Sequence, residues 1–133
     1  MIVVDTSAVV AIFRQEDEAA RYAGLIAADE APVISAANLV EVSLVLRGLK
    51  RIPPQRAERW LDDFVAAAGL HVEPVTADQA RLARLAHMRF GKGTGHGAAL
   101  NYGDCFAYAL AKALGAPLLY KGSDFAMTDI ATS

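Results

Sequence analysis

Single acidic residues interrupt segments of this chain that otherwise consist of apolar or small side chains. They are Asp5 in IVVDTSAVVAIF, Glu41 in SAANLVEVSLVL, Asp104 in LNYGDCFAYALA and Asp124 in LLYKGSDFA. An isolated carboxylate is costly to bury without a compensating positive charge, and carboxylates that converge raise each other's pKa values. A divalent cation removes both costs. The pattern therefore predicts a fold that gathers these acids around Mg²⁺, with Mn²⁺ as the alternative ion.

Short apolar segments alternate with segments of helical periodicity along the chain. Strands are expected at 2–4, 32–34, 71–75 and 118–120, with a further short edge strand at 129–130. Helices are expected to begin at residue 8 and to cover 16–28, 36–50, 56–68, 80–88 and 102–114. This order predicts one α/β domain over residues 1–133, with a mainly parallel central sheet of four to five short strands flanked by helices.

The predicted elements would bring the acids to one edge of the sheet. Asp5 ends the first strand and Asp124 follows the fourth, and parallel sheets bind ligands outside the carboxyl ends of their strands. Glu41 lies about two turns into its helix, and Asp104 is the third residue of its helix. Simpler roles remain open, namely turn residues for Asp5 and Asp124 and a helix-dipole interaction for Asp104. Glu41 is the hardest to explain structurally, because its helix is apolar nearly all round at that point.

The charges are segregated along the chain, although the net charge is only −2. Stretches without any acid lie between Glu41 and Glu58 and between Asp78 and Asp104. The second stretch contains Arg81, Arg84, His87, Arg89, Lys92 and His96. Acids outside the predicted site collect elsewhere, at 16–18, 29–30 and 62–63. This separation is typical of a protein whose anionic partner approaches one side, although ordinary solvated helix faces would also produce it.

The sequence argues against a disulfide-rich protein, a signal peptide, a membrane span and a P-loop. A single cysteine, Cys105, rules out an intramolecular disulfide framework, and a reducing, cytoplasmic setting is the simplest inference. The N-terminus lacks the basic region of a signal peptide, and no apolar run reaches the roughly 18 residues of a membrane span. The loop GKGTGHG lacks the spacing of a nucleotide-binding P-loop.

In this order and spacing, the segments resemble a PIN domain, and most closely a VapC-type ribonuclease toxin of a type II toxin–antitoxin system. MIVVDTSAVVAIF resembles the N-terminal strand of that family, and SAANLVEVSLVL resembles its helix with a single glutamate. LNYGDCFAYALAKALGAPLLYKGSDFAMTDI resembles its C-terminal signature. The resemblance covers essentially the whole chain. It implies a homodimer, RNA as the substrate, and inhibition by a cognate antitoxin whose tail covers the acidic site.

The resemblance also implies which acids act. Three metal-binding catalytic acids carry over from the family: Asp5, Glu41 and Asp104. Family members often have another acid one or two places before Asp124, where this chain has Gly122 and Ser123. The fourth acid is therefore Asp124 or Asp129, or it is missing.

The resulting interpretation is a Mg²⁺-dependent endoribonuclease. Metal-activated water would attack phosphorus in line and leave 5′-phosphate and 3′-hydroxyl ends. The residues expected to orient the acids or water are Thr6, Ser7 and Asn101, for which helix capping is the simpler role. Contacts with the RNA backbone are expected from the basic residues of 47–56 and from Arg81, Arg84, Arg89, Lys92, His96 and Lys121.

Two other classes of function stay open. A metal-dependent phosphatase of the aspartyl-phosphate type also places an acid after its first strand, but it usually has a second Asp where this chain has Ser7. A catalytically silent PIN-like binding module would keep the fold without the activity. Turnover of a small phosphomonoester identifies the phosphatase. Loss of growth on expression, rescued by substitution of an acid, separates an active toxin from the silent module.

Overall fold

The sheet of the computed structural model is small and entirely parallel. The structure describes residues 1–132. The strands are β1 (Ile2–Val4), β2 (Pro32–Ser35), β3 (His71–Glu73) and β4 (Leu118–Leu119). They lie in the order β3-β2-β1-β4, and Val3 of β1 pairs with Val33 on one side and Leu118 on the other. The predicted α/β fold with a mainly parallel sheet of four to five strands is confirmed.

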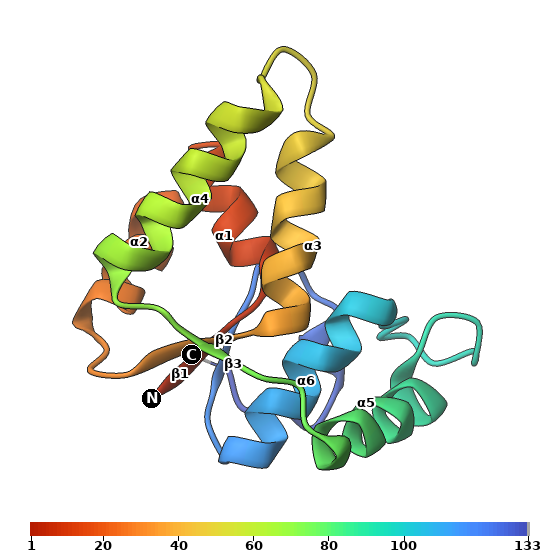
Figure 1. Cartoon of the computed structure of the whole chain (residues 1–133). Helices are drawn as coiled ribbons and strands as arrows, with labels where there is room; N and C mark the ends of the chain where they lie inside the picture. Colours follow the sequence, from red (N-terminus) through yellow and green to blue (C-terminus); the bar gives the residue numbers. More distant parts are fainter. Residues whose placement is uncertain (133) are drawn as a thin grey trace.

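Helices cover both faces of this sheet (Figure 1). They are α1 (Thr6–Phe13), α2 (Ala19–Ala28), α3 (Ala36–Arg47), α4 (Pro54–Ala68), α5 (Ala77–Phe90) and α6 (Tyr102–Leu114), and a 3-10 turn follows at Phe125–Met127. Within the described residues, none of these helices is long and apolar enough to cross a membrane.

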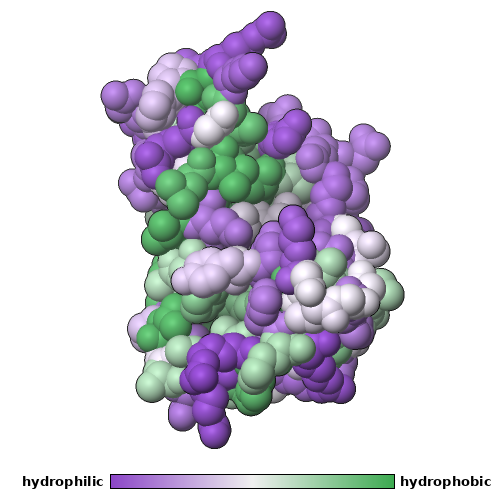
Figure 2. Space-filling view, turned by 90° about the vertical axis from the view of Figure 1, so that its right-hand side faces the viewer, coloured by the Kyte–Doolittle hydropathy of each residue, from purple (hydrophilic) through white to green (hydrophobic). Residues whose placement is uncertain are grey.

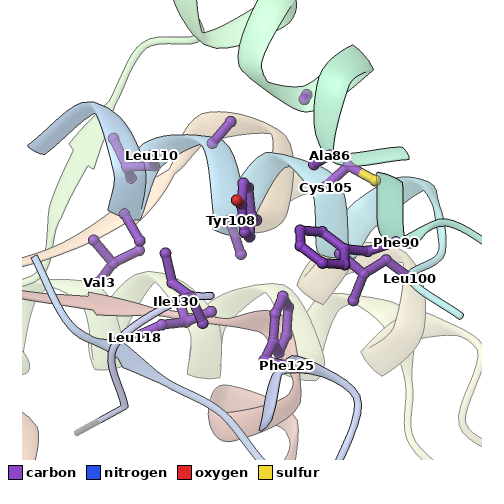
Figure 3. Close-up of a cluster of buried hydrophobic side chains, with 14 of the residues drawn as sticks. Val3, Ala86, Phe90, Leu100, Cys105, Tyr108, Leu110, Leu118, Phe125 and Ile130 are labelled. Carbon is purple, nitrogen blue, oxygen red and sulfur yellow. The ribbon is translucent and has the colours of Figure 1, made fainter. Parts of the chain in front are cut away.

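The hydrophobic side chains form two cores because successive residues of a strand point to opposite faces. Val3 packs with α5 and α6, whereas its neighbours Ile2 and Val4 pack with the helices from α1 to α4. Figure 3 shows the first core, in which Phe90 and Tyr108 lie close to one another at the centre. Strands β1, β2 and β4 are therefore buried on both faces, whereas the edge strand β3 is partly exposed.

Helix ends follow the capping signals in the sequence. The side chains of Ser35 and Thr76 accept backbone hydrogen bonds in the first turns of α3 and α5. Helices α4 and α6 end at Gly69 and Gly115, which have left-handed φ values of 62° and 60°. Since α1 and α3 start directly after β1 and β2, their first turns lie at the carboxyl edge of the sheet.

Some boundaries differ from the expected ones. Helix α2 begins at Ala19 rather than at 16, and α3 ends at Arg47 rather than at 50. Strand β3 ends at Glu73 because the next residue, Pro74, has no N–H to donate to a neighbouring strand. The edge strand expected at 129–130 is wrong for the described residues: a single bridge joins Leu118 to Thr132 instead.

The glycine-rich segment after α5 is closed by hydrogen bonds. A bridge joins Gly91 to Leu100, and the backbone N–H of Lys92 donates to the carbonyl of Leu100 at 2.8 Å. The φ values of Gly93 and Gly95 are 90° and 88°, which favour glycine at both positions. The loop predicted from the sequence is therefore present, with a fixed base next to the start of α6.

Candidate active site

Side chains from segments far apart in the sequence line a pocket of about 400 Å³ at the carboxyl edge of the sheet. The predicted acids Asp5, Glu41 and Asp104 are all part of its lining. The residues predicted to orient them, Thr6, Ser7 and Asn101, line it as well. The structure thus brings together three of the four acids that interrupt the apolar segments of the sequence.

Asp5 lies between β1 and α1 and is only 2% exposed. Its Oδ2 accepts hydrogen bonds from the backbone N–H of Ser7 at 3.0 Å and from the Ser7 hydroxyl at 2.6 Å. Its Oδ1 is buried and has no hydrogen-bond partner within the described residues. Burial, and to a lesser degree the charges of Asp104 and Glu41, raises the pKa of Asp5 to about 7. Asp5 therefore combines a helix cap with a free oxygen that lacks a compensating charge.

Glu41 is held in place by one polar group of α1 and one of its own helix α3. Its Oε1 accepts hydrogen bonds from the Thr6 hydroxyl at 2.5 Å and from Asn38 Nδ2 at 3.2 Å. Asn38 Nδ2 also donates to the carbonyl of Gly103 at 2.9 Å, so one fully buried amide joins α3 to α6. A Cβ atom at Gly103 would lie 1.9 Å from Glu41 Oε2. The glycine therefore leaves the space that the Glu41 carboxylate occupies.

Asp104 lines the pocket and also caps its own helix. Its Oδ2 accepts a hydrogen bond from the Asn101 backbone N–H at 3.0 Å, and its own N–H donates to Asn101 Oδ1 at 2.8 Å. This reciprocal pair is a capping box at the start of α6. Burial, with smaller contributions from the charges of Asp124 and Glu41, raises the pKa of Asp104 to about 6. The capping role does not remove Asp104 from the pocket.

The two candidates for a fourth acid lie in different surroundings. Asp124 is exposed in the turn before Phe125 and does not line the pocket, but its charge acts on Asp104. Asp129 accepts a hydrogen bond from the Tyr108 hydroxyl at 2.5 Å and forms an ion pair with Lys112 at 2.9 Å. These two contacts lower the pKa of Asp129. Of the two, only Asp124 is close enough to contribute negative charge to the site.

A further acid, Glu16, lines the pocket. The expectation that the acids of 16–18 lie away from the site is therefore wrong for Glu16. Its Oε1 lies 2.6 Å from Lys121 Nζ, and Glu18 Oε1 lies 3.5 Å from the same nitrogen. The backbone N–H of Lys121 donates to the Ser7 hydroxyl at 2.9 Å. Lys121, predicted as an RNA contact, is thus the one cation that lines the pocket within residues 1–132.

The other predicted RNA contacts lie outside the acidic pocket: the basic residues of 47–56 between the end of α3 and the start of α4, and the rest on α5 and the glycine-rich loop. Arg89 forms an ion pair with Asp129 at 3.4 Å and lies over the ring of Phe90. His96 Nδ1 accepts the backbone N–H of Ala98 at 3.0 Å, and its ring packs edge-on against Phe90. The remaining ones, Arg81, Arg84 and Lys92, are exposed. Within residues 81–96 these three form no such internal contact, and neither do the exposed Lys50, Arg51 and Arg56 of the other basic stretch, whereas Arg47 pairs with Glu58.

Three residues of the site were not predicted: Asn38, Gly103 and Glu16. Asn38 carries a signal, because it lies three residues before Glu41 on the same face of an otherwise apolar helix. Gly103 precedes Asp104 inside a helix, where glycine is costly and needs a reason. Glu16 gives no such signal, since its partner Lys121 is 105 residues away.

The donor set of the pocket fits a divalent cation. Within residues 1–132, no three His, Cys, Asp or Glu side chains lie close enough to hold one ion as they stand. Mg²⁺ does not require such a cluster, because it keeps several waters and takes only one or two carboxylates. The partnerless Oδ1 of Asp5 and the raised pKa values of Asp5 and Asp104 indicate uncompensated negative charge. The oxygens available for such an ion are carboxylate oxygens, which hard cations prefer.

We expect the metal-free protein to lose stability as the pH rises from about 4 to about 7. The pKa of Asp5 is 3.8 in the unfolded chain and about 7 in the fold. The unfolded state therefore releases the proton first, and the free energy of unfolding falls over this range by up to a few kcal/mol. Denaturant unfolding in EDTA should show a larger loss in the wild type than in Asp5→Asn, in which Asp5 cannot ionise and only Asp104, with its pKa raised to about 6, still contributes to the loss.

The same unfolding measurement is repeated with Mg²⁺ in place of EDTA. Above pH 7 the ion should stabilise the wild type and leave Asp5→Asn nearly unchanged, because binding to the native state alone raises stability. Equal stabilisation of both proteins by Mg²⁺ would show that Asp5 is not part of the cation site.

The chain is similar to known proteins over nearly its whole length. Residues 2–131 match the family model described as PIN domain. The chain is 47% identical over 129 residues to Ribonuclease VapC28 of Mycobacterium tuberculosis, covering 97% of this chain and 95% of the relative. It is 45% identical over 130 residues to Ribonuclease VapC of Mycolicibacterium smegmatis, covering 98% of each.

Solved structures share the fold at lower sequence identity. Mycobacterium tuberculosis VapC20, described as a Sarcin-Ricin loop cleaving toxin, superposes with a TM-score of 0.78 at 20% identity, over 100% of this chain and 98% of that one. A chain of a toxin-antitoxin complex from Klebsiella pneumoniae gives a TM-score of 0.72 at 17% identity, over 100% and 97%. At these identities the likeness concerns the fold alone.

Proposed function

Because the chain belongs to the PIN domain family, and within it to the VapC ribonucleases, we propose that it is the Mg²⁺-dependent endoribonuclease toxin of a toxin–antitoxin pair. The observation that carries the proposal is the pocket in which Asp5, Glu41 and Asp104 meet beside Lys121. Two relatives above 40% identity are named ribonucleases, which supports RNA as the substrate.

The acids would hold one or two ions, directly or through water. Ser7 occupies only Oδ2 of Asp5, so Oδ1 remains free for an ion. Thr6 and Asn38 bond to Oε1 of Glu41 and thereby fix the orientation of its carboxylate. Bound Mg²⁺ would activate water and neutralise the charge that develops on the phosphate and on the leaving 3′-oxygen.

Lys121 is the chain's own positive charge at this pocket. Its backbone is anchored to the Ser7 hydroxyl, which itself donates to Asp5. The ammonium group is bound to Glu16 and Glu18 in the free protein, and its side chain is 36% exposed. A phosphate of the RNA backbone would compete with these two carboxylates for the ammonium group. Lys121 would then place the phosphate at the mouth of the pocket.

The alternative of an aspartyl-phosphate phosphatase finds no support at Asp5. The residue two places further on is Ser7, whose hydroxyl donates to Asp5 instead of adding a second carboxylate. The nuclease proposal predicts no turnover of a small phosphomonoester such as p-nitrophenyl phosphate.

Helix α3 leaves an apolar surface beside the pocket on which a protein partner could pack. Apolar side chains of α3 remain exposed beside the pocket: Val40 is 59%, Leu44 58% and Val45 39% exposed. Figure 2 shows hydrophobic surface in the upper half of that face of the molecule, where α3 lies. A cognate antitoxin and a second copy of the chain are the proposed partners, and the neighbour from a toxin-antitoxin complex supports the first.

Mapping of the RNA ends tests the function directly. We expect the wild type to cut RNA in Mg²⁺ and to lose this activity in EDTA, with 5′-phosphate and 3′-hydroxyl ends that a ligase accepts. These ends follow from attack by water, whereas attack by the neighbouring 2′-hydroxyl would leave 2′,3′-cyclic phosphates. Cyclic ends, or cleavage that persists in EDTA, would contradict metal-dependent hydrolysis.

A further inference from the structure

A second hollow, of about 520 Å³, lies between α5 and α6. Its apolar lining includes Met88 from α5 and Cys105 and Phe106 from α6, and Arg84, His87 and Tyr102 complete it. Asn101 and Asp104, in contrast, line the acidic pocket. The first two turns of α6 therefore form a wall with one hollow on each side.

Tyr102 offers an exposed aromatic face at this wall. It is the first residue of α6 and is 80% exposed, although its ring is held edge-on against Phe106 with centroids 4.9 Å apart. It precedes Asp104 by two residues, which is about 3 Å along a helix axis. A large aromatic ring left in solvent is a platform on which a planar group can stack.

The charged residues that line the second hollow, called the groove from here on, favour an anionic ligand. Arg84 is its one positively charged lining residue, and no acid lines it within the described part of the chain. The only acid of α5 is Asp78, in the first turn. The exposed ring of His87 lies against Gly91, where an added Cβ atom would lie 2.5 Å from its Cδ2. An apolar floor, an aromatic platform and a cationic rim together match a nucleotide.

We propose that this groove holds an unpaired nucleobase of the RNA substrate next to the phosphate that is cut, with Tyr102 stacked on the base and Arg84 on the adjoining phosphate. The inference rests on the proposed nuclease function and adds a substrate class to it. A base paired in a duplex cannot enter the groove, so the RNA is single-stranded at this position. Recognition of the base takes place at Tyr102, whereas cleavage takes place on the other side of the wall.

Binding without cleavage tests this assignment. The full-length protein in EDTA is titrated with a fluorescein-labelled single-stranded RNA 12-mer and with an oligomer of the same length and backbone but without bases. Tyr102→Ala should weaken binding of the RNA by roughly tenfold or more, as expected for the loss of one stacked base, and leave the base-free oligomer unaffected. Tyr102→Phe should bind like the wild type, because it keeps the ring. Arg84→Gln should weaken both oligomers.

The outcomes separate this inference from the function on which it rests. Equal RNA affinity of the wild type and Tyr102→Ala overturns the base site but leaves the nuclease intact. Sedimentation is measured in parallel, and a wild-type dimer that Tyr102→Ala converts into a monomer would make the groove a subunit interface and overturn the proposal. A wild type that neither binds nor cuts any RNA would remove the proposed function and the base site together.

Discussion

Asp104→Asn is expected to lower RNA cleavage at saturating Mg²⁺ by at least about 100-fold while the protein stays folded. The substitution removes one negative charge from the proposed ion site. Loss of a residue that only hydrogen-bonds to a metal ligand costs about 10–100-fold in activity, so loss of a ligand itself should cost at least as much. Asparagine can still accept the hydrogen bond from Asn101, so the capping box of α6 survives. The fold is checked by circular dichroism and by thermal unfolding, and the cleavage rate by single-turnover kinetics.

Two other Asp→Asn variants show whether the loss of activity depends on the position of the acid. Asp62→Asn, on the exposed surface of α4, removes the same charge far from the pocket and should cleave RNA at the wild-type rate. Asp124→Asn distinguishes a fourth catalytic acid from a turn residue, and we expect a smaller loss than for Asp104→Asn because Asp124 does not line the pocket. Wild-type activity of Asp104→Asn in Mg²⁺ would show that the acids do not hold the catalytic ion.

The acids could be found from the sequence because burial makes an isolated carboxylate conspicuous. Asp5 and Glu41 interrupt apolar segments, and the alternation of strands and helices then places Asp5 at the carboxyl edge of the sheet. The same alternation was sufficient for the parallel sheet, because β1 and β2 are each followed at once by a helix. Local pattern therefore predicted the architecture and three of the pocket's acids.

The local sequence pattern does not predict side chains whose surroundings are formed by elements far apart in the chain. Glu16 reaches the pocket because α1 has only eight residues, and the turn after it leads the chain back to Lys121. Asn38 becomes important only when the carbonyl of Gly103 packs against it. Ion pairs and amide contacts of this kind join residues far apart in sequence, and no local periodicity indicates them.

Gly103→Ala tests the packing that holds Glu41, and it is expected to reduce both stability and activity. A Cβ atom at this position would lie 1.9 Å from Glu41 Oε2, so the carboxylate must leave its contacts with Thr6 and Asn38 or α6 must move. Overpacking of this kind costs about 1–3 kcal/mol of folding free energy. Displacement of a proposed ion ligand should lower cleavage by roughly 100-fold, at the upper end of effects on outer partners of metal sites.

Two further variants separate the crowding from the general effect of adding a methyl group to a helix. Gly24→Ala lies within α2 with no atom near the added Cβ, so it should stabilise the protein by about 0.5–1 kcal/mol and leave cleavage unchanged. Gly103→Ala combined with Glu41→Asp withdraws the carboxylate from the new methyl group and should recover much of the lost stability without recovering activity. Full cleavage by Gly103→Ala would mean that Glu41 does not need its present position, and the proposed ion site would then rest on Asp5 and Asp104 alone.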